Sequence, residues 1–166
     1  MNLNEFFEYK NYLMKLLCSD EAVVRQMTAS EEAAVPNHTL PYTEIFPDEF
    51  VPETADKATT FICFDVDIVD VMNRTYYNPV LYIWIFTHAS KLHMEEGGVL
   101  TDQICVAVNR LLNGNRLFGL GRLSLKSVSR FVPIQDYQGR CMVFTATDFN
   151  RPYSKNRVPS NRREDR

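Results

Sequence analysis

The hydrophobic positions between residues 59 and 150 predict the order strand, strand, helix, strand, strand. In the first strand, residues 59–71, the even-numbered positions from 62 to 68 are apolar and the odd-numbered positions are mixed. Because alternate side chains of a strand point to opposite faces, this pattern predicts a sheet with one apolar face. The apolar positions are Ile62, Phe64, Val66 and Ile68, and the alternate positions include Asp65 and Asp67. In the second strand, residues 80–88, the even- and the odd-numbered positions are both mostly apolar. Both of its faces should therefore be covered, within one chain or by another subunit.

Residues 101–113 place apolar side chains at steps of three and four, which predicts an amphipathic helix. Thr101 or Asp102 is expected to cap it, and Asn113-Gly114 to end it with a left-handed residue. A third strand, a turn at residues 136–139 and a fourth strand over residues 140–149 follow. The predicted fold class is α+β, with a mainly antiparallel sheet of four or more strands and this helix packed on one face. The expected core residues are Ile62, Phe64, Val66, Leu81, Ile83, Ile85, Ile104, Val108, Leu111, Val143 and Phe144.

Two segments precede this core. Residues 3–17 have the period of an N-terminal helix, and Ser19-Asp20-Glu21 can cap a second short helix that runs to about Met27. Their apolar stripe could dock on the chain's own sheet or on a neighbour. Residues 28–58 contain a proline every five or six positions between Pro36 and Pro52, with apolar residues between them. Proline opposes helices and central strands alike, so an extended Pro-rich strap across a surface is expected.

The length of 166 residues favours one domain with a sizeable core. We expect a single domain over residues 1–150, made of N-terminal helices (1–27), the strap (28–58) and the sheet and helix core (59–150). Residues 151–166 form a basic C-terminal arm with six basic and two acidic residues, whereas the formal charge of residues 1–150 is −7. Arg157, Arg162 and Arg163 in this arm could contact an acidic neighbour, solvent or nucleic acid.

The spacing of the cysteines and the hydropathy of the chain indicate the compartment in which the protein is made. The four cysteines are scattered, without the paired spacing of a zinc site, which indicates free thiols in a reducing compartment. The N-terminus lacks the pattern of a signal peptide, and the longest apolar run, residues 79–86, is too short for a membrane helix. We therefore expect a protein that is made in the cytoplasm and has no membrane partner.

The candidate chemistry is weak. Asp65, Asp67 and Asp70 could bind magnesium as in metal-dependent nucleases, but no lysine follows on the same strand, and a solvated or subunit-facing edge is the favoured interpretation. His88 and His93 form no ligand pattern, and no nucleophile and base are paired. The expectation is a protein with no catalytic residues, no metal and no cofactor; a nuclease that uses Asp65 and Asp67 is the alternative of a different class.

The order of elements resembles that of the tail-terminator, or tail-completion, proteins of tailed bacteriophages. The likeness rests on an N-terminal helix (3–17), a long first hairpin (61–88), one helix on the sheet (101–113) and a late strand pair (123–149). The strap and the basic arm have no counterpart in this resemblance. It implies a structural virion protein at the tail–neck junction, assembled in the host cytoplasm. Another head–tail connector or neck protein is the nearest alternative.

The resemblance implies partners as well as a fold. These are other copies of the chain in a homo-oligomeric ring of six subunits, a tail-tube protein and a head-side connector protein, with DNA in the lumen bound without sequence recognition. The predicted loop at residues 73–78 and a second loop at residues 91–98 are candidate contact regions, as is the strap. The candidate interface residues are Arg74, Tyr76 and Tyr77 in the first loop, Glu95 and Glu96 in the second, and Phe46 and Phe50 in the strap.

Overall fold

The computed structural model describes residues 4–28, 40–52, 58–70, 75–116 and 122–150. It confirms the α+β class, with three α-helices and a mainly antiparallel sheet of six strands in which β1-β2-β3-β5-β4 are neighbours and β6 pairs with β3. The helices are α1 (Asn4–Ser19), α2 (Glu21–Thr28) and α3 (Leu100–Leu112), with a short 3-10 helix η1 (Ala89–Lys91). The strands are β1 (Ile45–Phe46), β2 (Thr60–Asp70), β3 (Tyr76–His88), β4 (Ser124–Phe131), β5 (Tyr137–Thr145) and β6 (Asp148–Phe149).

All three helices contribute to one core on the same face of the sheet. The apolar stripe of α1 docks on the chain's own sheet through fully buried Leu13 and Leu17, and α2 packs on α3 and α1 with fully buried Val23 in the same core. Asp20 caps α2, because its Oδ1 accepts a hydrogen bond from the Val23 amide at 2.9 Å. The apolar face predicted for the first strand is confirmed, because the even-numbered apolar residues of β2 enter this core. The odd-numbered apolar residues of β3 enter it as well. The buried strand residues are Ile62, Phe64, Val66, Leu81, Ile83, Ile85, Met142 and Phe144.

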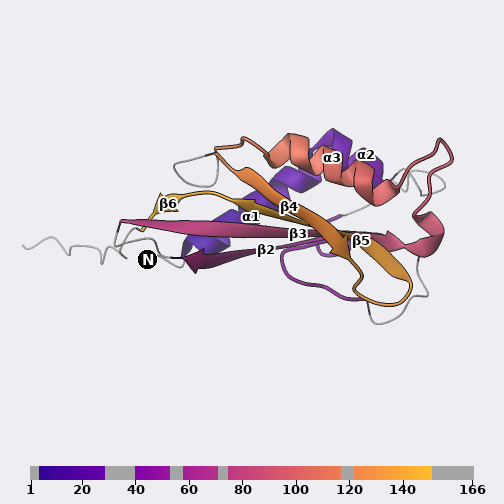
Figure 1. Cartoon of the computed structure of the whole chain (residues 1–166), viewed down its shortest axis with the longest axis horizontal. Coiled ribbons are helices and arrows are strands. Elements are labelled where there is room, and N and C mark those ends of the chain that lie inside the picture. The colour runs from indigo at the N-terminus through magenta and orange to yellow at the C-terminus, as the bar shows by residue number, and fades with distance from the viewer. Residues whose placement is uncertain (1–3, 29–39, 53–57, 71–74, 117–121, 151–166) are drawn as a thin grey trace, which may run out of the picture.

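The opposite face of the sheet is covered by the strap at one end. Phe46 and Phe50 stack on each other with ring centroids 4.1 Å apart, and both rings contact Phe61 of β2. They belong to a second cluster built on Phe61, Cys63, Phe86 and Tyr137. Figure 1 shows α2 and α3 on one side of the sheet and the purple segment of residues 40–52 on the other. The apolar residues of both faces of β3 are therefore covered, in large part, by the same chain.

The two borders of the sheet differ. At one border β1 pairs in parallel with Ile62 and Cys63 of β2, and Lys10 Nζ of α1 lies 2.6 Å from Asp65 Oδ1 on the same strand. A strand inside the predicted strap was not expected, and it is a short edge strand as proline-rich sequence allows. At the other border, β4 pairs on one side with β5.

Two strand predictions need correction. The segment at residues 76–78 is not loop but the start of β3, and the predicted fourth strand is divided into β5 and β6. The strand pairing with β3 is interrupted opposite Pro79. The Pro79 carbonyl accepts a hydrogen bond from the Ala146 amide at 3.2 Å, but proline has no N–H that could donate a second hydrogen bond across the pair. The expected turn at residues 136–139 is displaced toward the N-terminus: the chain turns at Gln135-Asp136, and Tyr137 and Gly139 already pair with His88 and Phe86 in β5.

The predicted cap of the central helix is wrong as well. The N-cap residue of α3 is Val99, which makes no side-chain cap hydrogen bond, so the helix begins one residue earlier than expected. Thr101 is buried in the first turn, and Asp102 bonds to Arg140 of β5 instead. The left-handed residue after the helix is confirmed at Gly114, with φ +86°.

Candidate interaction surfaces

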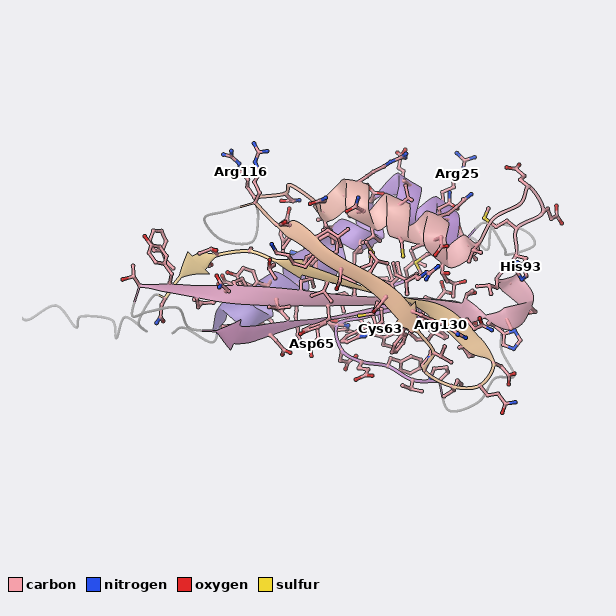
Figure 2. All side chains as sticks on the ribbon, viewed as in Figure 1. Arg25, Cys63, Asp65, His93, Arg116 and Arg130 are labelled. Atoms are coloured by element: carbon pink, nitrogen blue, oxygen red, sulfur yellow. The ribbon has the colours of Figure 1, made fainter. Side chains whose placement is uncertain are left out.

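The exposed edge strand β4 carries a basic surface. Arg122, Lys126 and Arg130 are exposed, and so are the apolar Val128 and Val132. Lys126 lies in a β-bulge, because the register with β5 shifts between Leu125 and Ser127. We call these five residues the basic edge; Figure 2 shows Arg130 on β4.

Carboxylates gather on the strap side of the sheet. Asp48, Glu49 and Asp67 are exposed and Asp65 is half-buried. Burial raises the pKa of the Cys63 thiol to about 12, and the carboxylates of Asp48 and Glu49 add to that rise. Burial also raises the pKa of Cys141 on β5, and Glu49 adds to it. Asp48 and Glu49 lie between Phe46 and Phe50 in the chain, and both of these rings pack against Phe61 on the face of the sheet that points away from the helices. We call Asp48, Glu49, Asp65 and Asp67 the acidic face.

The loop between β3 and α3 projects from one end of the molecule (Figure 1). His88 starts it by accepting a hydrogen bond from the Ser90 amide on Nδ1 at 3.2 Å. At its tip Gly97 and Gly98 have φ of +86° and +102°, a conformation that favours glycine. Glu95 and Glu96 are exposed there, where a partner can reach them, as predicted for this loop. The contact itself stays a prediction.

Tyr77, predicted as an exposed loop residue, is instead fully buried at the start of β3. Its hydroxyl donates a hydrogen bond to Glu5 Oε2 at 2.7 Å and lies 3.2 Å from the Tyr9 hydroxyl. Tyr9 of α1 donates to Asp148 Oδ2 of β6. Burial raises the pKa of Tyr9 and of Tyr77. The hydrogen bond with Asp148 adds to the rise for Tyr9, and the hydrogen bonds with Tyr9 and Glu5 add to it for Tyr77. These phenols stay protonated and fasten α1 to β3 and β6.

The remaining interface candidates have mixed positions. Tyr76 is half-buried, and its ring stacks on Phe149 with centroids 5.5 Å apart. Phe46 and Phe50 are half-buried in the second cluster of their own chain, so most of their contacts are internal. Arg74, Arg157, Arg162 and Arg163 lie outside the described residues.

The candidate metal-binding carboxylates are partly engaged by the chain itself. Asp65 forms its ion pair with Lys10, and its Oδ1 also accepts the Val66 amide at 2.7 Å. A lysine does lie beside this strand, but it comes from α1 rather than from β2. In the described part of the chain, no group of three or more His, Cys, Asp or Glu side chains is placed to hold a metal. The side chain of Asp70 is outside that description. In the same described ranges, no helix is long and apolar enough to cross a membrane.

The chain belongs to the YomW family, whose sequence model matches residues 10–146. The family is associated with Bacillus phages of the SPbeta type, which indicates a phage-encoded protein. The match runs from the middle of α1 to the end of β5 and so includes the elements that build the core. No curated protein matches the chain.

Sequence reasoning missed the basic edge, although a signal for it exists. From Gln103 to Gln135 the chain has five basic residues and no acidic one, whereas the rest of residues 1–150 has seven basic and nineteen acidic residues. Averaging the charge of residues 1–150 hides this difference. The sequence alone could not tell that the basic stretch includes the strand at the open border of the sheet.

Proposed function

We propose that this phage protein is a structural component of the virion, a tail terminator that forms a ring on the tail tube and joins it to the head-side connector. In this role the chain acts without catalysis. Its partners are further copies of itself, the tail-tube protein and the connector, and DNA passes through the lumen without sequence recognition. Six copies per ring is the number that the resemblance implies.

The observation that carries the proposal is the agreement between a phage-associated family and the element order of the tail-terminator resemblance. The chain has an N-terminal helix, α1, and a long first hairpin, β2–β3. It also has one helix between the strand pairs, α3, and a late antiparallel pair, β4–β5. A neck protein next to the terminator is the closest competing role, and it shares the expectation of a ring.

The open border of the sheet supports self-association. An exposed edge strand is a site for contacts with another chain unless it is guarded. The bulge and the charges of β4 guard it against unspecific strand pairing, while they leave side chains available for a specific partner.

Localisation of the protein in purified particles tests the proposal. Antibody-gold labelling viewed by electron microscopy should place the label at the junction between head and tail. Label along the whole tail, label inside the head, or a protein absent from the particle would each contradict the proposed role.

A further inference from the structure

We propose that neighbouring copies associate head to tail, with the basic edge of one copy on the acidic face of the next. This inference rests on the proposed ring and names the surfaces that form it. The two surfaces lie on different parts of the molecule, since β4 ends the strand order at one border of the sheet, whereas Asp65 and Asp67 lie on β2 toward the other border. Asp48 and Glu49 lie on the strap, which packs against Phe61 of β2 on the face away from the helices. In Figure 2, Arg130 lies on β4, whereas Asp65 points from β2 to the side away from α2 and α3.

The charges of the two surfaces are complementary. Arg122, Lys126 and Arg130 are exposed on the basic edge, and Asp48, Glu49 and Asp67 are exposed on the acidic face. Complementary potentials steer association and fix the orientation of a contact. A two-fold contact of β4 with β4 would bring like charges together, which is unfavourable. The charge pattern therefore favours a heterologous contact, and heterologous contacts that close generate rings.

Apolar side chains are exposed on the basic edge and on the strap segment that carries Asp48 and Glu49. Val128 and Val132 on the basic edge are 48% and 45% exposed, and Tyr42 and Val51 of the strap segment are 65% and 41% exposed. An interface commonly has apolar contacts at its centre and charges around them. The bulge at Lys126 interrupts the edge of β4, so the contact is made by side chains and does not continue the sheet from copy to copy.

Two charge-reversal variants and one control test this contact. K126E/R130E reverses the basic edge, and E49K/D67K reverses the acidic face. Asp65 is left unchanged because of its ion pair with Lys10. The control, K15E/R25E, makes the same charge change at exposed positions of α1 and α2. The mass distribution of each full-length protein is measured by sedimentation at several concentrations and salt levels.

The wild-type protein and the control should form oligomers that weaken as salt rises, because salt screens exposed charges. Each reversal variant alone should associate about tenfold more weakly or worse, since like charges then face each other. An equimolar mixture of the two variants should recover the oligomer, because every contact in an alternating ring is again complementary. Circular dichroism checks that each variant is folded.

Several results would overturn the inference. If both reversal variants still formed oligomers, the protein could still form a ring, but its subunits would contact each other through other surfaces. A mixture that stays monomeric, or a wild-type protein that stays monomeric at millimolar concentration in low salt, would reject this contact whatever the particles show. If K126E/R130E lost affinity for a labelled DNA duplex but kept its oligomers, the basic edge would be a phosphate-binding surface instead. The gold labelling above tests the proposed function independently of all these outcomes.

Discussion

Arg140 and Asp102 form a two-pronged ion pair between β5 and the first turn of α3. Arg140 Nε donates to Asp102 Oδ1 at 2.7 Å, and a terminal guanidinium nitrogen donates to Oδ2 at 3.1 Å. The same carboxylate raises the pKa of Arg140. This planar geometry is the favourable one for arginine and carboxylate. The pair links the first turn of α3 to β5, and we expect it to help orient the helix on the sheet.

A double-mutant cycle measures this pair. Asp102→Ala, Arg140→Ala and the double variant should give a coupling energy of about 0.5–1 kcal/mol in urea unfolding, because the side chains are partly exposed and water screens them. The coupling should shrink in high salt. Gln103→Ala, one exposed position further along α3, serves as the control. A coupling energy of zero would mean that the pair does not orient the helix.

Gly139 should not tolerate a side chain. It lies within β5 opposite Phe86 on one side and Phe131 on the other. A Cβ at this position would collide with the Ile85 carbonyl oxygen and lie 2.6 Å from Phe86 Cα. Gly139→Ala should therefore lower the free energy of unfolding by about 2–3 kcal/mol in urea titration. Gly114→Ala is a useful comparison, since no atom lies within 4 Å and the cost there comes from its φ of +86°. A loss under half a kcal/mol (about the scatter of surface substitutions) at Gly139 would contradict the packing described for β5.

Alkaline pH should destabilise the fold through Cys63. Its ordinary pKa of 9.0 is raised to about 12 by burial in the folded state. Below pH 9 the thiol is protonated in both states, and this contribution is constant. Between pH 9 and 12 the unfolded chain ionises first, so stability falls by up to about 1.4 kcal/mol per pH unit for this group. Cys63→Ala should have a shallower fall between pH 9 and 11 than the wild type, measured by urea unfolding at each pH. Equal slopes would show that this thiol ionises in the folded protein.

We expect the protein to have no nuclease activity. Asp65 is engaged by Lys10 and by the Val66 amide, and exposed Asp67 is assigned to a subunit contact. Purified protein incubated with plasmid and single-stranded DNA, with magnesium or manganese, should leave both intact. Cleavage that disappears in Asp65→Ala and Asp67→Ala would replace the structural role with a metal-dependent nuclease.

Much of the fold was predictable because burial leaves a periodic record in the sequence. Alternation in β2 and the stripe of α3 identified most of the core, and nine of the eleven expected core residues are buried. Leu111 and Val143 are half-buried, whereas Leu112, which was not among them, is completely buried. A stripe with steps of three and four places Leu111 and Leu112 on the same side of the helix, and the facing strands decide which one points inward.

The surfaces were harder to predict, because they depend on how distant elements meet. The polar residues next to Tyr77 in the sequence are typical of a loop. In the structure Tyr77 is buried, because it pairs with Asp148 of β6 and its hydroxyl forms a hydrogen bond to Glu5 of α1. Phe46 and Phe50 are aromatic residues in a proline-rich segment, which favours a contact with another subunit. In the structure they pack instead against β2 of their own chain. The basic edge needs the strand order of the sheet, since a local pattern does not reveal that β4 lies at the border.

The most direct measurement of the central claim is tail length in particles from a phage with an early stop codon in this gene. If the protein terminates the tail, electron microscopy should show tails of uncontrolled length that are separate from filled heads. The wild-type gene supplied from a plasmid should restore uniform joined particles, and K126E/R130E should not. Headless tails of normal length would favour a neck protein instead. Intact infectious particles with normal tails would contradict the account.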